Sequence, residues 1–234
     1  MVHTRDSHDG EAGPAVAAVI NQLFLKKSGR YVLVIDAGSG NGSFLKWTHD
    51  IFKRDGNYQR QRLYLVGYEN NETLVEQSKE LLQDQPNTKV YQKDLVSFTN
   101  CLSDYGRCQI AVFCNNFEFC WNDSTTNRIH KSLCARLSLT LSSETIKVGT
   151  RVITLCPISL DGWEEKRFAI NFPNGCGFSW APNEENLMLY VYEKISCDDN
   201  DDDRFSSSKV RSKVEQFKYT FDSETGQLVA SGKG

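Results

Sequence analysis

The sequence predicts an α/β fold in which helices cover a mostly parallel sheet. Short apolar runs of strand length alternate with segments of helical periodicity along most of the chain. This alternation is typical of parallel strands joined by right-handed helical crossovers. Because 39% of the 234 residues are hydrophobic, the chain can form one domain with a sizeable core.

The first predicted element is a helix over 15–27, which Pro14 opens at a position that favours proline. A β-branched run, 31–35, predicts a buried strand, and a glycine-rich turn leads from it into a helix over 43–52. The next predicted strands are 63–68, 90–92, 109–114 and 150–155, and the next helices are 72–83 and 126–139.

The last part of the chain predicts strands without intervening helices. Two runs, 187–195 and 213–221, have strand character, and we expect them to pair antiparallel at one sheet edge. The segment 197–208 between them begins with the run CDDNDDDR, which predicts a solvated acidic loop. Residues 1–30 are expected to cover a ligand site, and 31–234 to complete the single domain.

The charge balance argues against a general nucleic-acid binder. Lys and Arg number 27 against 30 Asp and Glu, so the formal net charge is −3, whereas such binders carry a basic excess. Without the five aspartates at 198–203 the net charge would be +2. We expect the basic residues Lys53, Arg54, Arg60 and Arg62 on the same side as the ligand.

Neither a metal site nor a membrane span is expected. The eight cysteines contain no CxxC pair and the four histidines no HxxxH pair, although zinc sites usually show such spacing. Several cysteines lie in apolar runs, where a thiol packs as a small hydrophobic group. This favours reduced cysteines in a cytosolic or nuclear compartment. The apolar stretches are too short to cross a bilayer.

Glycines and polar side chains follow the predicted strands where those strands end. Ligands of open α/β sheets bind at this edge, beyond the carboxyl ends of the strands. Glu69 could accept the ribose hydroxyls and Asp94 an adenine amino group, which predicts an adenosine-containing cofactor. The candidate residues at these strand ends are Asp36, Gly38, Ser39, Gly40, Gly42, Glu69, Asp94, Leu95, Asn115 and Asn116.

The glycine spacing distinguishes between adenosine cofactors. A dinucleotide fingerprint needs a third glycine where Ser43 stands, and an acid about 20 residues further on, earlier than Glu69. The order DxGxGxG, followed by acids ending the second and third strands, resembles class I S-adenosylmethionine-dependent methyltransferases. The resemblance implies their Rossmann-like, mostly parallel seven-stranded sheet, with an antiparallel C-terminal edge hairpin.

Each feature also has a plainer explanation. Glycines after a strand often form only a turn, and the two asparagines could be a turn as well. Glu69 and Asp94 could be N-caps of the helices that follow them. The occurrence of these residues at four successive strand ends favours the ligand site.

Several segments resemble a narrower family. The run Phe113-Cys114-Asn115-Asn116-Phe117-Glu118-Phe119 is similar to the V-N-N-F-x-F segment of the non-SET histone H3 lysine methyltransferases, the disruptor-of-telomeric-silencing family. Asp9-Gly10-Glu11 is similar to the Y-G-E loop of that family. Phe178-Ser179-Trp180 falls where the family has V-S-W, and Leu155-Cys156-Pro157 where it has S-K-P. The chain is similar to the compact branch of trypanosomatid protists.

This resemblance implies a role for each candidate residue. Gly10 and Glu11 would form a loop over the methionine moiety, and Asp36 and the glycine run would line methionine and ribose. Glu69 would bind the ribose and Asp94, with Leu95, the adenine. Asn115 and Asn116 would lie at the methyl-transfer centre. Phe117 and Trp180 would wall a narrow channel for a neutral lysine amine.

The resemblance also implies a nuclear, monomeric enzyme that needs no metal and acts on histone H3 in the nucleosome core, with weak contact to nucleosomal DNA. The chain departs from the family at two loop positions, where Asp9 replaces a tyrosine and Ala12 a threonine. A channel tyrosine that follows the family's V-S-W has no clear counterpart.

Three other functions fit parts of the pattern. The two asparagines and Phe117 stand where methyltransferases of exocyclic base amines have Asn-Pro-Pro-aromatic, although this chain lacks the prolines and a basic flank. A non-catalytic partner module of the same fold is possible, but the acids at 36, 69 and 94 argue against it. A nicotinamide oxidoreductase is the third alternative.

Overall fold

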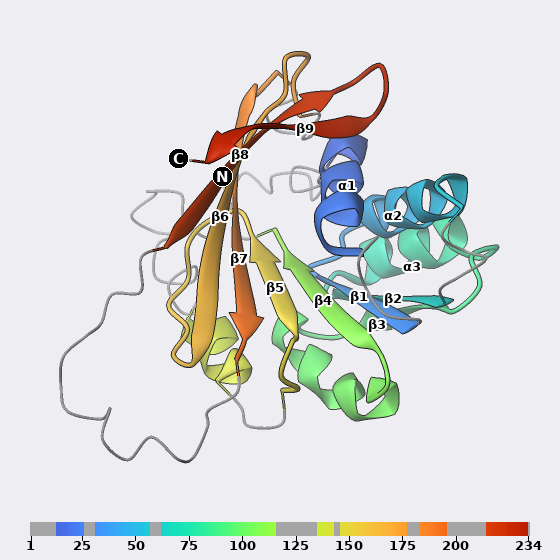
Figure 1. The fold of residues 1–234 in the computed structure, drawn as a ribbon. Coiled ribbons are helices and arrows are strands. Elements are labelled where there is room, and N and C mark those ends of the chain that lie inside the picture. Colours follow the sequence, from blue (N-terminus) through green and yellow to red (C-terminus); the bar gives the residue numbers. More distant parts are fainter. Residues whose placement is uncertain are drawn as a thin grey trace, which may run out of the picture.

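The structure is a computed structural model that describes residues 13–25, 31–56, 62–115, 135–142, 146–176, 183–195 and 214–233. Within these residues nine strands form one sheet in the order β3-β2-β1-β4-β5-β7-β6-β8-β9 (Figure 1). The strands are β1 (Tyr31–Ala37), β2 (Arg62–Glu69), β3 (Thr88–Gln92), β4 (Gln109–Cys114), β5 (Arg151–Thr154), β6 (Trp163–Asn171), β7 (Asn186–Lys194), β8 (Glu215–Asp222) and β9 (Gln227–Lys233).

One helical segment precedes β1, and the others form crossovers between the strands that follow it. The first is α1 (Pro14–Ile20), which continues as a π-helical turn, η1 (Asn21–Leu25). The others are α2 (Ser43–Arg54), α3 (Glu72–Leu81) and the 3-10 helix η3 (Leu95–Tyr105). Residues 135–141 are helical as well. The expected α/β alternation is therefore confirmed from β1 to β5.

The strand directions agree with the predicted class of sheet. β1 to β5 pair only in parallel with one another, whereas β7 is antiparallel to both of its neighbours, β5 and β6. The predicted number of seven strands is wrong, because the sheet has nine.

Two strand predictions at the C-terminal end are wrong. β7 and β8 do not pair, because β6 lies between them, antiparallel to β7 and parallel to β8. The edge hairpin is instead β8–β9, so the sheet has nine strands. β6 escaped prediction because its first half, WEEKR, is highly charged, and β9 because most of its side chains are exposed.

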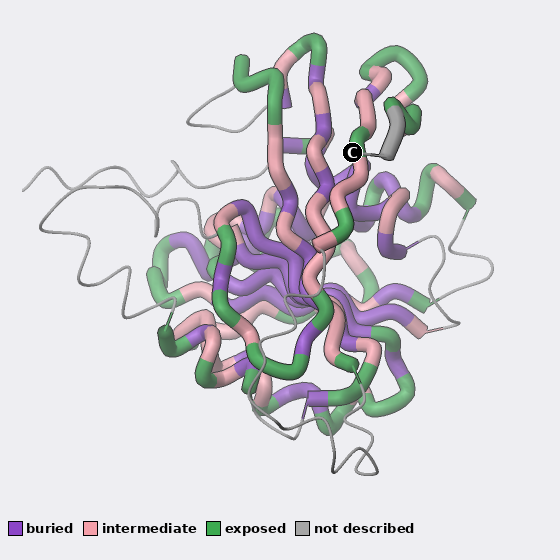
Figure 2. Tube along the Cα trace, turned by 60° about the vertical axis from the view of Figure 1, so that its left-hand side comes forward, coloured by how far each residue is buried: buried purple, intermediate pink, exposed green. Residues whose placement is uncertain are grey.

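Both faces of the sheet are covered, as an α/β fold requires. One hydrophobic cluster joins α1 and α2 to alternate residues of the strands, including Val34, Leu65 and Phe113. The second cluster joins η3 and residues 135–141 to the other face, including Ile35 and Val112. Figure 2 shows the buried strands through the middle of the molecule.

The β8–β9 hairpin is attached to the first helical segment, which it crosses in Figure 1. The side-chain amide of Gln22 accepts a hydrogen bond from the Leu228 amide at 2.8 Å and donates one to the carbonyl of Gly226. Gln22 thereby pairs with the outer edge of β9 much as another strand would.

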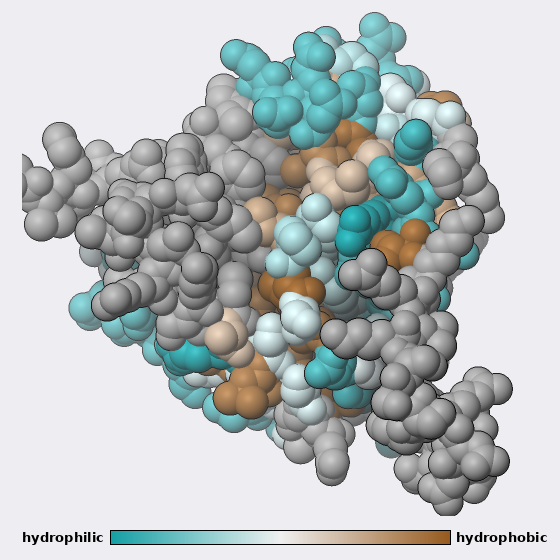
Figure 3. All heavy atoms as spheres, turned by 90° about the vertical axis from the view of Figure 1, so that its left-hand side faces the viewer, coloured by the Kyte–Doolittle hydropathy of each residue, from teal (hydrophilic) through white to brown (hydrophobic). Residues whose placement is uncertain are grey.

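The surface of the described part is mixed in character. Figure 3 shows hydrophobic side chains gathered toward the middle of one side, with hydrophilic ones around them. None of the helices among the described residues has the length and apolar character that a membrane crossing requires.

Candidate cofactor site

The glycine run after β1 forms a tight loop that only glycine suits at three positions. Gly38, Gly40 and Gly42 have φ angles of +89°, +52° and +85°, a region that other L-residues rarely adopt. The amides of Gly38 and Ser39 both donate to the carbonyl of Tyr68 at 2.9 Å, which ties the loop to the end of β2.

Two of these glycines have different surroundings. Among the described residues, a Cβ added to Gly38 would meet nothing within 4 Å, whereas a Cβ on Gly42 would lie 2.3 Å from Ser78 Oγ of α3. Gly42 is therefore needed for packing between α2 and α3, and Gly38 leaves open space beside the strand ends, as a ligand site requires.

Glu69, the last residue of β2, holds this loop with its carboxylate. Oε2 accepts the amide of Gly40 at 3.0 Å, and Oε1 accepts the amides of Asn70 and Asn71, each at 2.8 Å. Since each carboxylate oxygen can accept about two hydrogen bonds, Oε2 can still accept one hydroxyl. The N-cap of α3 is Asn71, whose side chain accepts from the Leu74 amide, so the interpretation of Glu69 as that N-cap is wrong.

Asp94 is the N-cap of the helix that follows it, as the plainer explanation predicts. Its Oδ1 accepts the Val96 amide at 3.1 Å, which makes Asp94 the N-cap of η3. Its Oδ2 accepts from the Arg136 guanidinium at 2.8 Å. Each oxygen retains acceptor capacity, so capping and adenine binding are compatible. Leu95 is partly buried beside the second cluster.

The remaining described candidates lie at the same edge. Asp36 is 3% exposed, and its register partners are Gly67 on β2 and Phe113 on β4. Asn115 is partly buried just after β4. Ser39 Oγ is buried and has no hydrogen-bond partner among the described residues; a Cβ on Gly67 would lie 2.7 Å from it, so Ser39 packs over β2.

Five predicted site residues lie outside the described part of the chain. They are Gly10, Glu11, Asn116, Phe117 and Trp180. The acidic loop 197–208 also lies outside it.

Sequence reasoning missed Arg136, because nothing local connects a helix after β4 to the acid after β3. It also missed Gly67, although a glycine inside an apolar strand is a recognisable sign of close backbone or side-chain approach.

Burial favours the neutral forms of two side chains near the end of β2, Tyr68 and its neighbour Cys101. Tyr68 is buried beside Cys101, and burial raises the pKa of the Tyr68 hydroxyl and of the Cys101 thiol. Among the residues that the structure describes, no group of three or more His, Cys, Asp or Glu could hold a metal ion.

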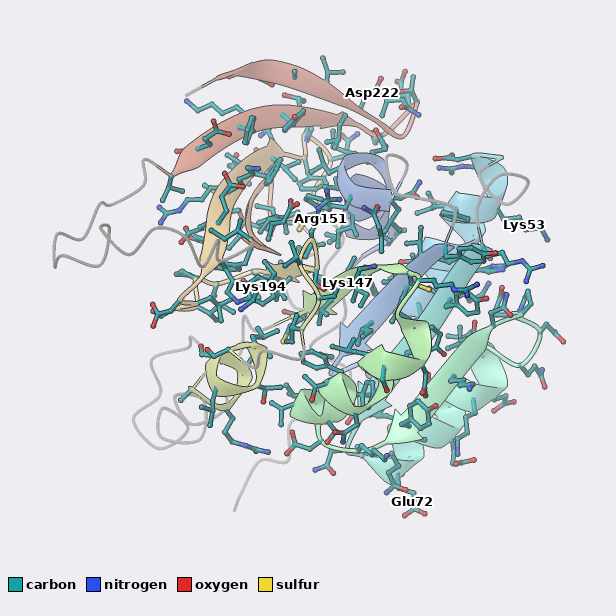
Figure 4. All side chains as sticks on the ribbon, turned by 60° about the horizontal axis from the view of Figure 1, so that its bottom comes forward. Lys53, Glu72, Lys147, Arg151, Lys194 and Asp222 are labelled. Atoms are coloured by element: carbon teal, nitrogen blue, oxygen red, sulfur yellow. The ribbon has the colours of Figure 1, made fainter. Side chains whose placement is uncertain are left out.

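Three of the four predicted basic residues lie at the edge of the sheet opposite the candidate site, and the fourth, Arg60, lies outside the described residues. Lys53 and Arg54 form the last turn of α2, and Arg62 begins β2, so all three lie away from the carboxyl ends of the strands. Figure 4 shows Lys53 far from Glu72, which begins α3 after Glu69. The expectation that they lie beside the cofactor is wrong, because α2 leads away from the glycine loop.

The same edge, away from the candidate site, carries further basic residues that contact their own neighbours. Arg151 pairs with Glu193 at 3.2 Å, and Lys147 donates to the carbonyls of Gly106 and Cys108. With Lys194 they form a group in Figure 4. These contacts stabilise the ends of β4, β5 and β7.

Comparison with known proteins identifies the fold. No family model and no curated protein matches the sequence. A provisionally assigned class I S-adenosylmethionine-dependent methyltransferase from Listeria monocytogenes superposes with a TM-score of 0.54 over 92% of this chain and 68% of that chain. The chain has the class I methyltransferase fold. Sequence identity is 11%, so the likeness concerns the fold alone.

A second protein with this fold is the modification subunit of a provisionally assigned type I restriction enzyme from Vibrio vulnificus. It superposes with a TM-score of 0.52 at 11% identity, over 93% of this chain. The chain spans about half of that subunit, 48% of its length.

The described residues fit S-adenosylmethionine, the cofactor of the class I methyltransferase fold. Gly38 leaves room beside the strand ends. Glu69 and Asp94 keep acceptor capacity for ribose hydroxyls and an adenine amine.

Glu69→Gln should weaken adenosine binding as well as the fold. A glutamine would place its amide NH2 group against the amide of Gly40 or those of Asn70 and Asn71, which costs about 1–3 kcal/mol of folding free energy. We expect at least about tenfold weaker binding of S-adenosylhomocysteine by calorimetry. Glu72→Gln, three residues on and exposed, is the control. Unchanged affinity in Glu69→Gln would contradict a ribose-side role.

Proposed function

We propose that the chain is an S-adenosylmethionine-dependent methyltransferase. The observation that carries this proposal is the glycine loop, which leaves open space at Gly38 and is bound to Glu69 through the Gly40 amide. It lies at the edge where ligands of open α/β sheets bind. The alternative of a nicotinamide dinucleotide has less support, because Ser43 replaces the third glycine of that fingerprint.

The residues of the chain would mainly bind the cofactor and orient the acceptor toward its methyl group. Bound S-adenosylmethionine supplies an activated methyl group, so the protein needs no strong base in its site. Glu69 would hold the ribose and Asp94 the adenine. Asp36 lies near the carboxyl end of β1 and Asn115 directly after β4, where the methionine end would be. Holding an acceptor amine in line with the methyl group is the main source of rate acceleration in such a site.

We further propose that the acceptor is a histone H3 lysine in the nucleosome core. This finer step rests on the similarity of residues 113–119, 9–11 and 178–180 to the non-SET histone methyltransferases. Phe117 and Trp180 would then wall an apolar channel, which favours the neutral amine of a lysine whose ordinary pKa is about 10.4. A nuclear location, a monomeric state and weak contact with nucleosomal DNA belong to the same proposal.

A second candidate acceptor is an exocyclic amine of a nucleic-acid base. It is favoured by the fold likeness to the restriction-system modification subunit and by the place of Asn115 and Asn116 after β4. The absence of prolines in Asn115-Asn116-Phe117 and a net charge of −3 argue against it.

One labelling experiment separates these acceptors. The chain is incubated with S-adenosylmethionine labelled in its methyl group and, in parallel, with nucleosomes, free histones, DNA and RNA. Label on histone H3 within nucleosomes supports the first proposal, and label on DNA or RNA alone supports the second. If calorimetry detects no binding of the cofactor, the methyltransferase proposal itself is wrong.

Asn115→Ala should slow methyl transfer more than it unfolds the protein. Asn115 follows β4 at the edge of the site and is only partly buried, so we expect turnover to fall about 10-fold or more and the free energy of unfolding by about 1 kcal/mol or less. Single-turnover assays and urea titrations measure the two. An unchanged rate on the labelled substrate would remove Asn115 from the site.

A further inference from the structure

The ion pair between Asp94 and Arg136 connects two crossovers at the adenine side of the site. Asp94 precedes η3, which follows β3, and Arg136 lies 42 residues away in the helical segment after β4. Leu137 and Leu141 of that segment are fully buried in the second hydrophobic cluster. The backbone that carries Arg136 is thus held against the sheet, and its guanidinium reaches Asp94 at 2.8 Å.

The Asp94 carboxylate is fixed from two directions. The Val96 amide binds Oδ1 at 3.1 Å, and Arg136 binds Oδ2 at 2.8 Å. Both partners are donors, so both oxygens are acceptors, and each keeps about one further lone pair. A carboxylate held in this way can accept a hydrogen bond from an amino group, but it repels a carbonyl oxygen.

We propose that Arg136 is a positioning residue that selects the adenine base of the cofactor through Asp94, an inference that rests on the proposed methyltransferase function. Arg136 keeps the carboxylate plane in the orientation that meets the 6-amino group of adenine. A base with a 6-oxo group in that place would leave Asp94 facing an acceptor, so the hydrogen bond would be replaced by repulsion between two oxygens.

The contribution of the pair to folding should be small, which makes the proposal testable. The side chains of Arg136 and Asp94 are 47% and 39% exposed, and ion pairs this exposed add little to stability. The helical segment that carries Arg136 is packed against the sheet by Leu137 and Leu141. Arg136→Ala should therefore remain folded.

The test compares two ligands that differ only at position 6 of the base. Calorimetry measures the dissociation constants of S-adenosylhomocysteine and its 6-oxo analogue S-inosylhomocysteine for the wild type, Arg136→Ala, Arg136→Lys and Arg54→Ala. Arg54 is the control, since its exposed side chain also pairs with an aspartate, Asp55, at 3.6 Å and lies away from the carboxyl ends of the strands. Thermal unfolding is followed for each variant.

We expect the wild type to prefer the adenosyl ligand at least about tenfold. Arg136→Ala should bind it about tenfold more weakly and the inosyl ligand almost unchanged, so the preference largely disappears. Arg136→Lys should restore part of the preference, and Arg54→Ala should behave as wild type.

Other outcomes overturn the inference in distinct ways. Equal loss of both ligands in Arg136→Ala would indicate a purely structural role, and tighter adenosyl binding would indicate that the pair blocks the site. Full retention of the preference would remove Arg136 from recognition. If the wild type binds neither ligand, the proposed function fails before Arg136 is tested.

Discussion

Gly40→Arg is expected to abolish cofactor binding in a protein that still folds. The Gly40 amide donates to Glu69 Oε2 from a backbone with φ of +52°, so an arginine there disturbs both the loop and the carboxylate that we propose binds the ribose. We expect S-adenosylmethionine to bind about 100-fold more weakly or not at all, equivalent to about 3 kcal/mol. Calorimetry gives the affinity, and the methyl-transfer rate should fall with it.

A control separates this effect from backbone strain. Gly56 has φ of +70° and nothing within 4 Å of an added Cβ, so Gly56→Arg introduces a comparable strain of about 1–2 kcal/mol away from the strand ends. It should keep the wild-type affinity. Full affinity in Gly40→Arg, with an unfolding transition like that of Gly56→Arg, would refute the assignment of the loop to the cofactor.

Gly42→Ala should destabilise the fold most among the small changes to the loop. Its φ is +85°, and the new methyl group would lie 2.3 Å from Ser78 Oγ and 3.0 Å from Leu82 Cδ1. Strain of about 1 kcal/mol and overpacking of about 1–3 kcal/mol together predict a loss of roughly 2–4 kcal/mol in the free energy of unfolding. Urea denaturation with unchanged m-value measures this loss.

A double-mutant cycle identifies the cause. Ser78 Oγ is buried without a hydrogen-bond partner among the described residues, so Ser78→Ala alone should cost little. In the Gly42→Ala background the same change removes the clashing atom and should recover about 1 kcal/mol or more. Gly56→Ala shows the cost of strain alone. Strict additivity of the two changes would exclude the α2–α3 contact as the cause.

The parts of this fold that follow from short-range pattern were predictable. Runs such as 110–114 are apolar throughout because both sheet faces are covered, and they are bounded by polar or turn residues. The glycine loop was equally clear, since three glycines within five residues after a strand indicate positive φ angles. The strand ends therefore located the candidate site from sequence alone.

The parts set by long-range contacts were not predictable. The buried residues of β6 are Trp163, Phe168 and Ile170. The four charged residues at 164–167 separate the first of them from the other two, so the run shows no alternating apolar pattern. The order of β7, β6 and β8 depends on which strands pair with one another, and the sequence of a single strand does not specify its partner. The partner of Asp94 is 42 residues away, and no periodicity relates the two.

The bond from Gln22 to Leu228 spans 206 residues, and it has a consequence for how the chain acquires its structure. The first helical segment and the last strand complete one another, so the cluster that contains α1 also needs Phe221 and Leu228. Closing such a long loop costs entropy before any contact compensates for it, and folds dominated by distant contacts form slowly. A nascent chain that ends before residue 228 exposes the edge of β8, and an exposed strand edge can pair with other chains and aggregate. The final closure of the sheet therefore waits until β9, residues 227–233, has been synthesised.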